Sequence, residues 1–231
     1  MQYPEYPYPE EGMASSFMYK VYGWMSFALA VTAGVAYYTF RTQAFFKYLT
    51  AHPWAMAGLV ILQFALVIVL AFYVMRMSLP VAIATFILYA ASLGLTMASI
   101  FFVYTKSSIY ATFIVTAGMF LATALYGYFT KTDLTSVGSF AIMGLFGLII
   151  GMLVNLFLRN STFDYILSGI GVIIFTLLTA YDTQKIKQIA SRLVADNQTR
   201  GKVAILGALT LYLDFINLFL FMLRFMGDRR E

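Results

Sequence analysis

The 231-residue chain contains no cysteine, a single histidine and very few charged residues. Without cysteine it cannot form disulfides, thiolate metal sites or a cysteine nucleophile. Charged residues make up 11% of the sequence, whereas soluble domains carry roughly a quarter. Hydrophobic residues account for 61%, so too few polar side chains remain to cover an apolar core. The composition indicates a protein whose surface is largely solvated by lipid.

The chain also lacks the signatures of two common classes of function. Its net charge of +5 is not arranged as a basic stripe interleaved with aromatic residues, so no nucleic-acid partner is expected. It shows no Ser/His, metal-ligand or paired catalytic motif, so it is not expected to be an enzyme or to hold a permanently bound cofactor.

The first 20 residues do not resemble a signal peptide, because they carry glutamates in place of a basic segment and have no apolar core. Residues 1–19 are rich in Tyr, Pro and Glu and are predicted to be a disordered N-terminal tail. Residues 20–231 are predicted to form one transmembrane domain.

Seven stretches are almost free of charge and long enough to cross a bilayer, which takes about 20 apolar residues per helix. Lipid offers no partner for an open strand edge, so these stretches are expected to be helices. The sequence therefore predicts an all-α bundle of seven transmembrane helices. The predicted spans are 21–40, 53–75, 77–105, 107–130, 134–158, 165–181 and 203–223.

Small residues in two spans predict close helix packing. They are Gly144, Gly147 and Gly151 in the fifth span, and the group around Gly94 in the third. Basic residues divide eight to seven between the two sides, which weakly favours a cytoplasmic N-terminus.

Asp214 is the only charge in the middle of a predicted span. Such a carboxylate costs about 2.5–3.5 kcal/mol on insertion scales, and intramembrane acids mostly mark pathways. Asp182, at the end of the sixth span, is a candidate partner. The two would titrate as a coupled, proton-sensitive pair, and their oxygens would suit transient Ca²⁺ binding. Alternatively, Asp182 is a residue of the membrane interface and Asp214 a structural, hydrogen-bonded carboxylate.

Two further residues are candidates for this site. Arg76 follows the second span on the same predicted side as Asp182, where it would pair with an aspartate and close a pathway; it is otherwise an interface anchor. Asn217 lies three residues after Asp214 on the same helical face and is expected to support its carboxylate through a hydrogen bond. Asp182 and Asp214 can meet only if the sixth helix continues beyond residue 181, which the apolar positions from Ile186 to Leu193 would permit.

Several motifs resemble the Bax inhibitor-1 family, also called the transmembrane Bax inhibitor motif family, in its bacterial branch. The most specific are TAYDTQKIK and, some thirty residues later, LGALTLYLDFINLFLFMLRF; the segments YKVYGWMSFALAVTAGVAYY, SIFFVYT and YGYFTKTDL add to them. The resemblance covers the chain from about Lys20 onward.

The resemblance implies a seven-helix bundle whose last helix is surrounded by the other six. It also implies a pH-sensitive calcium leak in a bacterial inner membrane, with the N-terminus in the cytosol. Asp182 and Asp214 would be the pH sensor, and Arg76 would be a gating latch.

Two other functions stay open. In the first, the chain is a regulator that binds another membrane protein, such as a membrane-anchored protease, through its polar tail or the basic stretch 183–202. Proton-coupled transport is disfavoured because no internal repeat is apparent.

Overall fold

The computed structural model describes residues 11–193 and 195–230, and this part of the chain is almost entirely helical. The predicted all-α fold class is confirmed. Outside the helices, the described residues contain one isolated antiparallel bridge, between Tyr104 and Arg229. In chain order the elements are α1 (Glu11–Thr42), α2 (Ala44–Ala51), α3 (Trp54–Tyr73), the 3₁₀ turn η1 (Val74–Arg76), α4 (Leu79–Met97), α5 (Ile100–Val103), α6 (Lys106–Phe129), α7 (Thr135–Leu158), α8 (Ser161–Arg192) and α9 (Asn197–Met226).

Six of the described helical segments are long and apolar enough to cross a membrane. The predicted first span, 21–40, lies within α1 but is not among them, because tyrosine, tryptophan, glycine and threonine dilute its apolar residues. The six are Trp54–Arg76, Leu79–Val103, Lys106–Phe129, Thr135–Leu158, Ser161–Arg192 and Asn197–Met226. The structure therefore supports a multi-span helical membrane protein, and the predicted count of seven spans is not confirmed.

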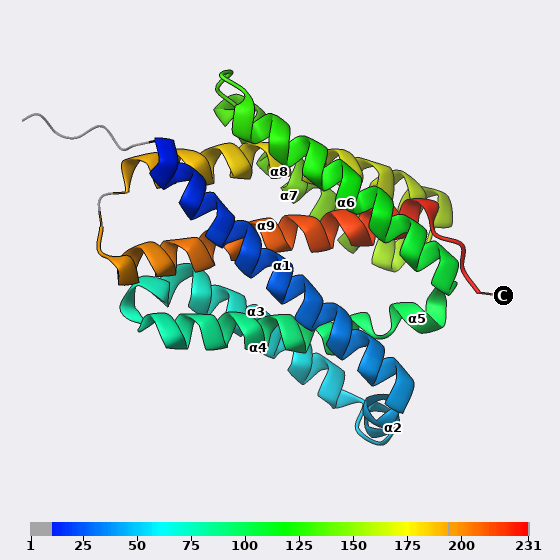
Figure 1. The fold of residues 1–231 in the computed structure, drawn as a ribbon. Helices are drawn as coiled ribbons and strands as arrows, with labels where there is room; N and C mark the ends of the chain where they lie inside the picture. Colours follow the sequence, from blue (N-terminus) through cyan, green and yellow to red (C-terminus); the bar gives the residue numbers. More distant parts are fainter. Residues whose placement is uncertain (1–10, 194, 231) are drawn as a thin grey trace, which may run out of the picture.

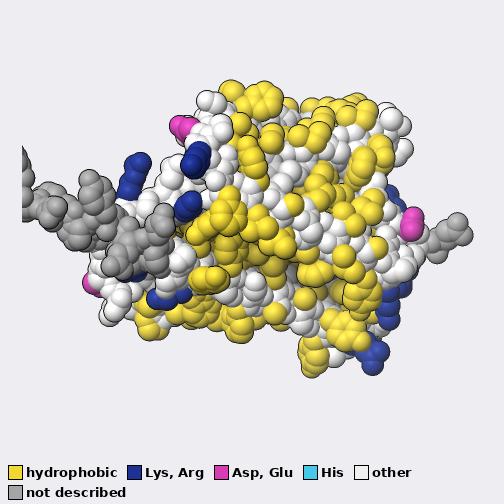
Figure 2. Space-filling model, turned by 45° about the horizontal axis from the view of Figure 1, so that its top comes forward, with side chains coloured by type: hydrophobic (Ala, Val, Ile, Leu, Met, Phe, Trp, Pro, Cys, Tyr) yellow, Lys and Arg dark blue, Asp and Glu magenta, His cyan; other side chains and the backbone are white. Residues whose placement is uncertain are grey.

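The helices bury their side chains to very different extents. In α9, 67% of the most apolar stretch is buried, against 6% in Trp54–Arg76. Figure 1 shows α9, in orange to red, running lengthwise between α6–α8 on one side and α3–α4 on the other, with α1 crossing it. On the face seen in Figure 2, hydrophobic side chains cover the middle of the molecule, while Lys and Arg gather towards its two ends. This distribution is that of a bundle with a lipid-facing belt.

Several boundaries differ from the prediction. The tail predicted over 1–19 is helical from Glu11, where α1 begins, and residues 1–10 lie outside the described part. The predicted third span is divided at Ala98 and Ser99 into α4 and α5, since the Ser99 hydroxyl and amide both bond to the carbonyl of Thr96. The short helix α2 was not predicted.

The largest difference concerns the sixth span. It was predicted to end at residue 181, but α8 continues to Arg192, because Ile186 and Ala190 bury an apolar face against the bundle. The basic stretch 183–202, which lies between the sixth and seventh predicted spans, is therefore mostly helical. Its short connection ends at Asp196, whose carboxylate accepts bonds from the amides of Gln198 and Thr199 and caps α9.

Candidate functional site

Asp182 lies on α8 and Asp214 on α9, two long helices that follow one another in the chain and run antiparallel. The helices α8 and α9 share the most extensive contact between any two described elements. Because α8 extends well beyond Tyr181, Asp182 lies inside a helix and not at its end. The sixth helix thus continues beyond residue 181, as it must if the two aspartates are to meet.

The two carboxyl groups lie close enough for each to influence the charge of the other. Asp214 is buried, with 5% of its surface exposed, whereas Asp182 is partly buried. One Asp214 oxygen, Oδ2, is enclosed and has no hydrogen-bond partner within the described residues. We call these two residues the aspartate pair. Within the described residues, no neutral donor bonds to Oδ2 of Asp214, and the carboxyl group of Asp182 lies close by.

A lysine of α8 lies near the aspartate pair. Lys185, one turn after Asp182, attracts its carboxylate, and its ammonium lies 5.6 Å from the centroid of the Tyr181 ring. Lys187 is directed elsewhere: its ammonium donates a 2.7 Å bond to the carbonyl of Tyr128 on α6. Lys185 itself is exposed.

Asn217 does not support Asp214 as predicted. Its side-chain amide donates to the carbonyl of Leu213, one turn earlier in α9, at 2.8 Å. This bond to its own helix satisfies the amide locally and leaves Asp214 to the aspartate pair.

Arg76 is not brought to the aspartate pair in this conformation. It ends η1, which packs against α9, but its guanidinium lies 5.6 Å from the centroid of the Tyr73 ring. No ion pair between Arg76 and an aspartate occurs in the described part of the chain. The structure thus places Arg76 near the helix that carries Asp214 without showing the latch.

A buried polar connection that was not predicted from the sequence involves Tyr212, two residues before Asp214 on α9. The Tyr212 hydroxyl lies 2.6 Å from the Thr32 hydroxyl, which also bonds to the carbonyl of Ala90 at 2.9 Å. Tyr212 and Thr32 are both buried, so this connection ties α9 to α1 and α4. Tyrosine and threonine are frequent in the apolar stretches here, and nothing in the sequence marked these two.

Two threonines on α6 are also part of the polar interior. Thr112 and Thr116 are fully buried, and their hydroxyls have no hydrogen-bond partner among the described residues. They lie on the same helical face as Phe113 and Phe120, whose rings contact Phe215 of α9. Unpaired hydroxyls therefore face the interior next to α9.

The sequence matches the family described as "Inhibitor of apoptosis-promoting Bax1" over residues 14–231, a range that includes every candidate residue named above. The chain belongs to the Bax inhibitor-1 family. It is 47% identical over 223 residues to the inner membrane protein YbhL of Escherichia coli K12, covering 96% of this chain and 95% of that protein. An uncharacterized protein of Borreliella burgdorferi is 44% identical over 94% of both chains. An uncharacterized membrane protein of Streptococcus pyogenes is 32% identical over 92% of this chain and 93% of its own.

The aspartate pair of this Bax inhibitor-1 family member offers few ligands to a metal ion. Two carboxylates supply at most four oxygens, whereas Ca²⁺ takes roughly 6–8. No cluster of three or more acidic, His or Cys side chains exists within 11–193 and 195–230. Backbone carbonyls and water would have to complete a calcium shell.

Proposed function

We propose that this chain provides a leak pathway for Ca²⁺ across the membrane and that the aspartate pair makes the leak sensitive to pH. The observation that carries the proposal is the position of Asp214. It is a buried carboxylate in the most buried helix, and it interacts with a second carboxyl group on the neighbouring helix. Ionisable groups placed in this way inside membrane bundles usually mark ion or proton pathways.

The chemistry of the pair suggests how a proton would act. With one proton shared, the two carboxyl groups hydrogen-bond and hold α8 against α9. With both groups ionised, the like charges repel each other in a low-dielectric interior, which favours separation of the helices. The free carboxylate oxygens are then available to a hard cation such as Ca²⁺. On this mechanism the leak rises as the pH rises.

The unpaired hydroxyls of Thr112 and Thr116 support the same pathway. A desolvated ion needs oxygen ligands along its route, and hydroxyl oxygens without a protein partner supply them. We include Arg76 as a latch that pairs with Asp182 in a closed state, because η1 packs against α9 and a change of rotamer would move the guanidinium towards the bundle.

The proposal includes a topology. We propose that α1 crosses the membrane as a seventh span, that α9 is surrounded by the other helices, and that the N-terminus is cytoplasmic. The Escherichia coli relative is described as an inner membrane protein, and we propose the same location for this chain.

Reconstitution into vesicles loaded with a calcium-sensitive dye tests the function. The wild type should admit Ca²⁺, and Asp214→Asn should change that flux. Asp133→Asn is a matched control, because Asp133 is an exposed acid in the α6–α7 connection. Absence of flux in the wild type, or an equal effect of both substitutions, would leave the chain as a regulator of another membrane protein rather than a channel.

A further inference from the structure

At the end of the bundle that holds the C-terminus lies a polar cavity of about 460 Å³. This cavity, which we call the arginine cavity, is formed where α7 ends, α8 begins and α9 ends. Its volume falls in the range of roughly 300–1,000 Å³ that is typical of small-ligand sites. Its charged lining residues are Arg159, Asp164, Arg224 and Arg229, and none of them belongs to the aspartate pair or its surroundings.

The chain holds these arginines in place by defined local structure. Arg159 adopts a left-handed backbone conformation, with φ 51°, in the two-residue turn between α7 and α8. Arg229 is fixed by the C-terminal segment, which bridges to Tyr104 and bonds through the Asp228 amide to the Ser108 hydroxyl. Arg224 lies in the last turn of α9, with its guanidinium 5.8 Å from the centroid of the Phe221 ring.

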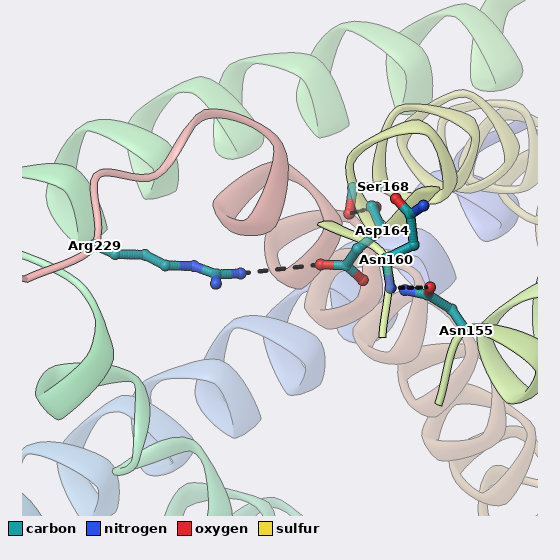
Figure 3. A network of polar contacts seen from close by, with 5 residues as sticks. All are labelled: Asn155, Asn160, Asp164, Ser168 and Arg229. Atoms are coloured by element: carbon teal, nitrogen blue, oxygen red, sulfur yellow. Dashed lines mark hydrogen bonds and ion pairs between the residues drawn. The ribbon is translucent and has the colours of Figure 1, made fainter. Parts of the chain in front are cut away.

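The arginine cavity carries an excess of positive charge. Its lining contains three arginines and one acid, Asp164. The Asp164 carboxylate lies 3.9 Å from the Arg229 guanidinium, and Figure 3 marks this ion pair. In the described part of the chain, neither Arg159 nor Arg224 has an acidic partner within ion-pairing distance. Two guanidinium groups are therefore left to bind an anion from outside the protein, and arginine forks match the oxygens of a phosphate.

The neutral lining residues are also arranged as donors. The side-chain oxygen of Asn155 accepts a bond from the backbone amide of Asn160 (Figure 3). The side-chain oxygen of Asn160 accepts a bond from the backbone amide of Phe163. With both oxygens engaged, each Asn retains its NH₂ group as a donor. Donors and arginines together disfavour a cation here. The positive end of the α8 dipole, which is 32 residues long, adds to the attraction of an anion.

The surroundings of the arginine cavity are apolar and exposed. The last turn of α7 presents Leu156, Phe157 and Leu158, of which Phe157 is 84% exposed. On the other side, the Tyr165 ring stacks on Phe225 at 4.7 Å. A polar, cationic cavity beside exposed apolar side chains matches the headgroup and acyl chains of a lipid.

We propose that the arginine cavity binds a phosphate group, presented by an anionic phospholipid or free in solution, through Arg159 and Arg224. This site is separate from the proposed calcium pathway and does not depend on it. The proposal can be tested on the full-length protein, purified in detergent and stripped of lipid. Native mass spectrometry measures retention of phosphatidylglycerol against phosphatidylcholine, and calorimetry measures binding of inorganic phosphate.

The wild type should prefer phosphatidylglycerol, and the double variant Arg159→Gln/Arg224→Gln should bind it about tenfold more weakly. Arg41→Gln is the matched control, because it removes an exposed arginine from the last turn of α1 without touching the cavity. Figure 1 shows that α1 ends towards the side of the molecule that holds the C-terminus. Both altered arginines are exposed, so an unchanged melting temperature should show that the double variant is folded. Inorganic phosphate binding that is lost in the double variant, without any lipid preference, would assign the same site to a soluble ligand. Lipid and phosphate binding that is equal in the double variant and the control would overturn the proposal.

Discussion

Asp214 places a carboxyl group in the membrane interior, where it is energetically unfavourable. A carboxylate at the centre of a membrane helix costs about 2.5–3.5 kcal/mol on insertion scales, and here its Oδ2 atom gains no hydrogen bond from the described residues. Replacement by an apolar residue would remove this cost. The retention of a carboxylate that interacts with Asp182 is understandable if the pair takes up and releases a proton, which neutral or apolar side chains cannot do.

The buried hydroxyl of Tyr212 makes a testable contribution to stability. The Tyr212 hydroxyl forms a 2.6 Å hydrogen bond with the Thr32 hydroxyl, in which either oxygen can be the donor. Tyr212→Phe should therefore lower the free energy of unfolding by about 1 kcal/mol, measured as a lower melting temperature in detergent. Tyr110→Phe is the control, because Tyr110 is 61% exposed. Equal melting temperatures for the two variants would contradict the role assigned to Tyr212.

The candidate residues that could be identified from the sequence are charged residues within or beside apolar stretches. Asp182 and Asp214 stand out because a charge within an apolar stretch needs a reason. Their supporting residues were harder to predict, because an asparagine such as Asn217 can satisfy itself on its own helix. Whether Arg76 reaches an aspartate depends on its rotamer, which sequence spacing does not determine.

At the level of helices, close approach is governed by a few glycines. On α6, a Cβ atom at Gly127 would collide with the backbone carbonyl of Ala180 on α8, whereas a Cβ atom at Gly118 would meet nothing within 4 Å. Because Ala180 lies two residues before Asp182, the contact at Gly127 also helps to position the aspartate pair. A backbone atom cannot move aside as a flexible side chain can.

Gly127→Ala should therefore destabilise the protein by about 1–3 kcal/mol, as overpacking does. In Gly118→Ala, the added methyl group meets open space and the helix loses a flexible residue, so this variant should be as stable as the wild type or up to about 1 kcal/mol more stable. Thermal unfolding of both variants in the same detergent measures the difference. A Gly127→Ala protein as stable as Gly118→Ala would show that α6 and α8 are not in close contact.

The small-residue pattern predicted only part of this packing. Gly94 packs closely against α1, at Thr32 and Val35, and Gly151 packs against Leu167, as close helix packing requires. Gly147, from the same predicted motif, faces open space, while Gly138 and Gly171 contact aromatic rings without belonging to any recognised motif. A spacing of four residues shows that glycines share a helix face, but not which face meets another helix.

For the molecule as a whole, the number of membrane crossings determines where the termini lie. The described residues contain six candidate spans by composition, and α1 would add a seventh. Because the chain has no cysteine, single cysteines at the exposed positions Ser16 and Arg230 can be labelled without background. With a membrane-impermeant maleimide on intact cells, seven crossings place the two positions on opposite sides. Labelling of both from the same side would show that α1 does not cross.

The fold class and most span positions could be predicted because lipid restricts the backbone to a few solutions. The lengths of α1 and α8 could not, since each continues past the end of its apolar stretch, where burial against other helices replaces burial in lipid. The candidate site, too, could be predicted only in part. Its two acids were predicted from sequence, but their contact depends on the extension of α8 to Arg192, which composition permits without requiring it.

The aspartate pair is tested most directly by calcium flux in reconstituted vesicles, measured from about pH 6 to about pH 8. The proteins compared are the wild type, Asp182→Asn, Asp214→Asn and the double variant. If the two carboxyl groups act as one proton-sensitive unit, the wild-type flux rises with pH, and each single variant loses that dependence as fully as the double variant. If the pH dependence persists in either single variant, or falls in two independent steps that add up in the double variant, the account of a paired sensor is wrong.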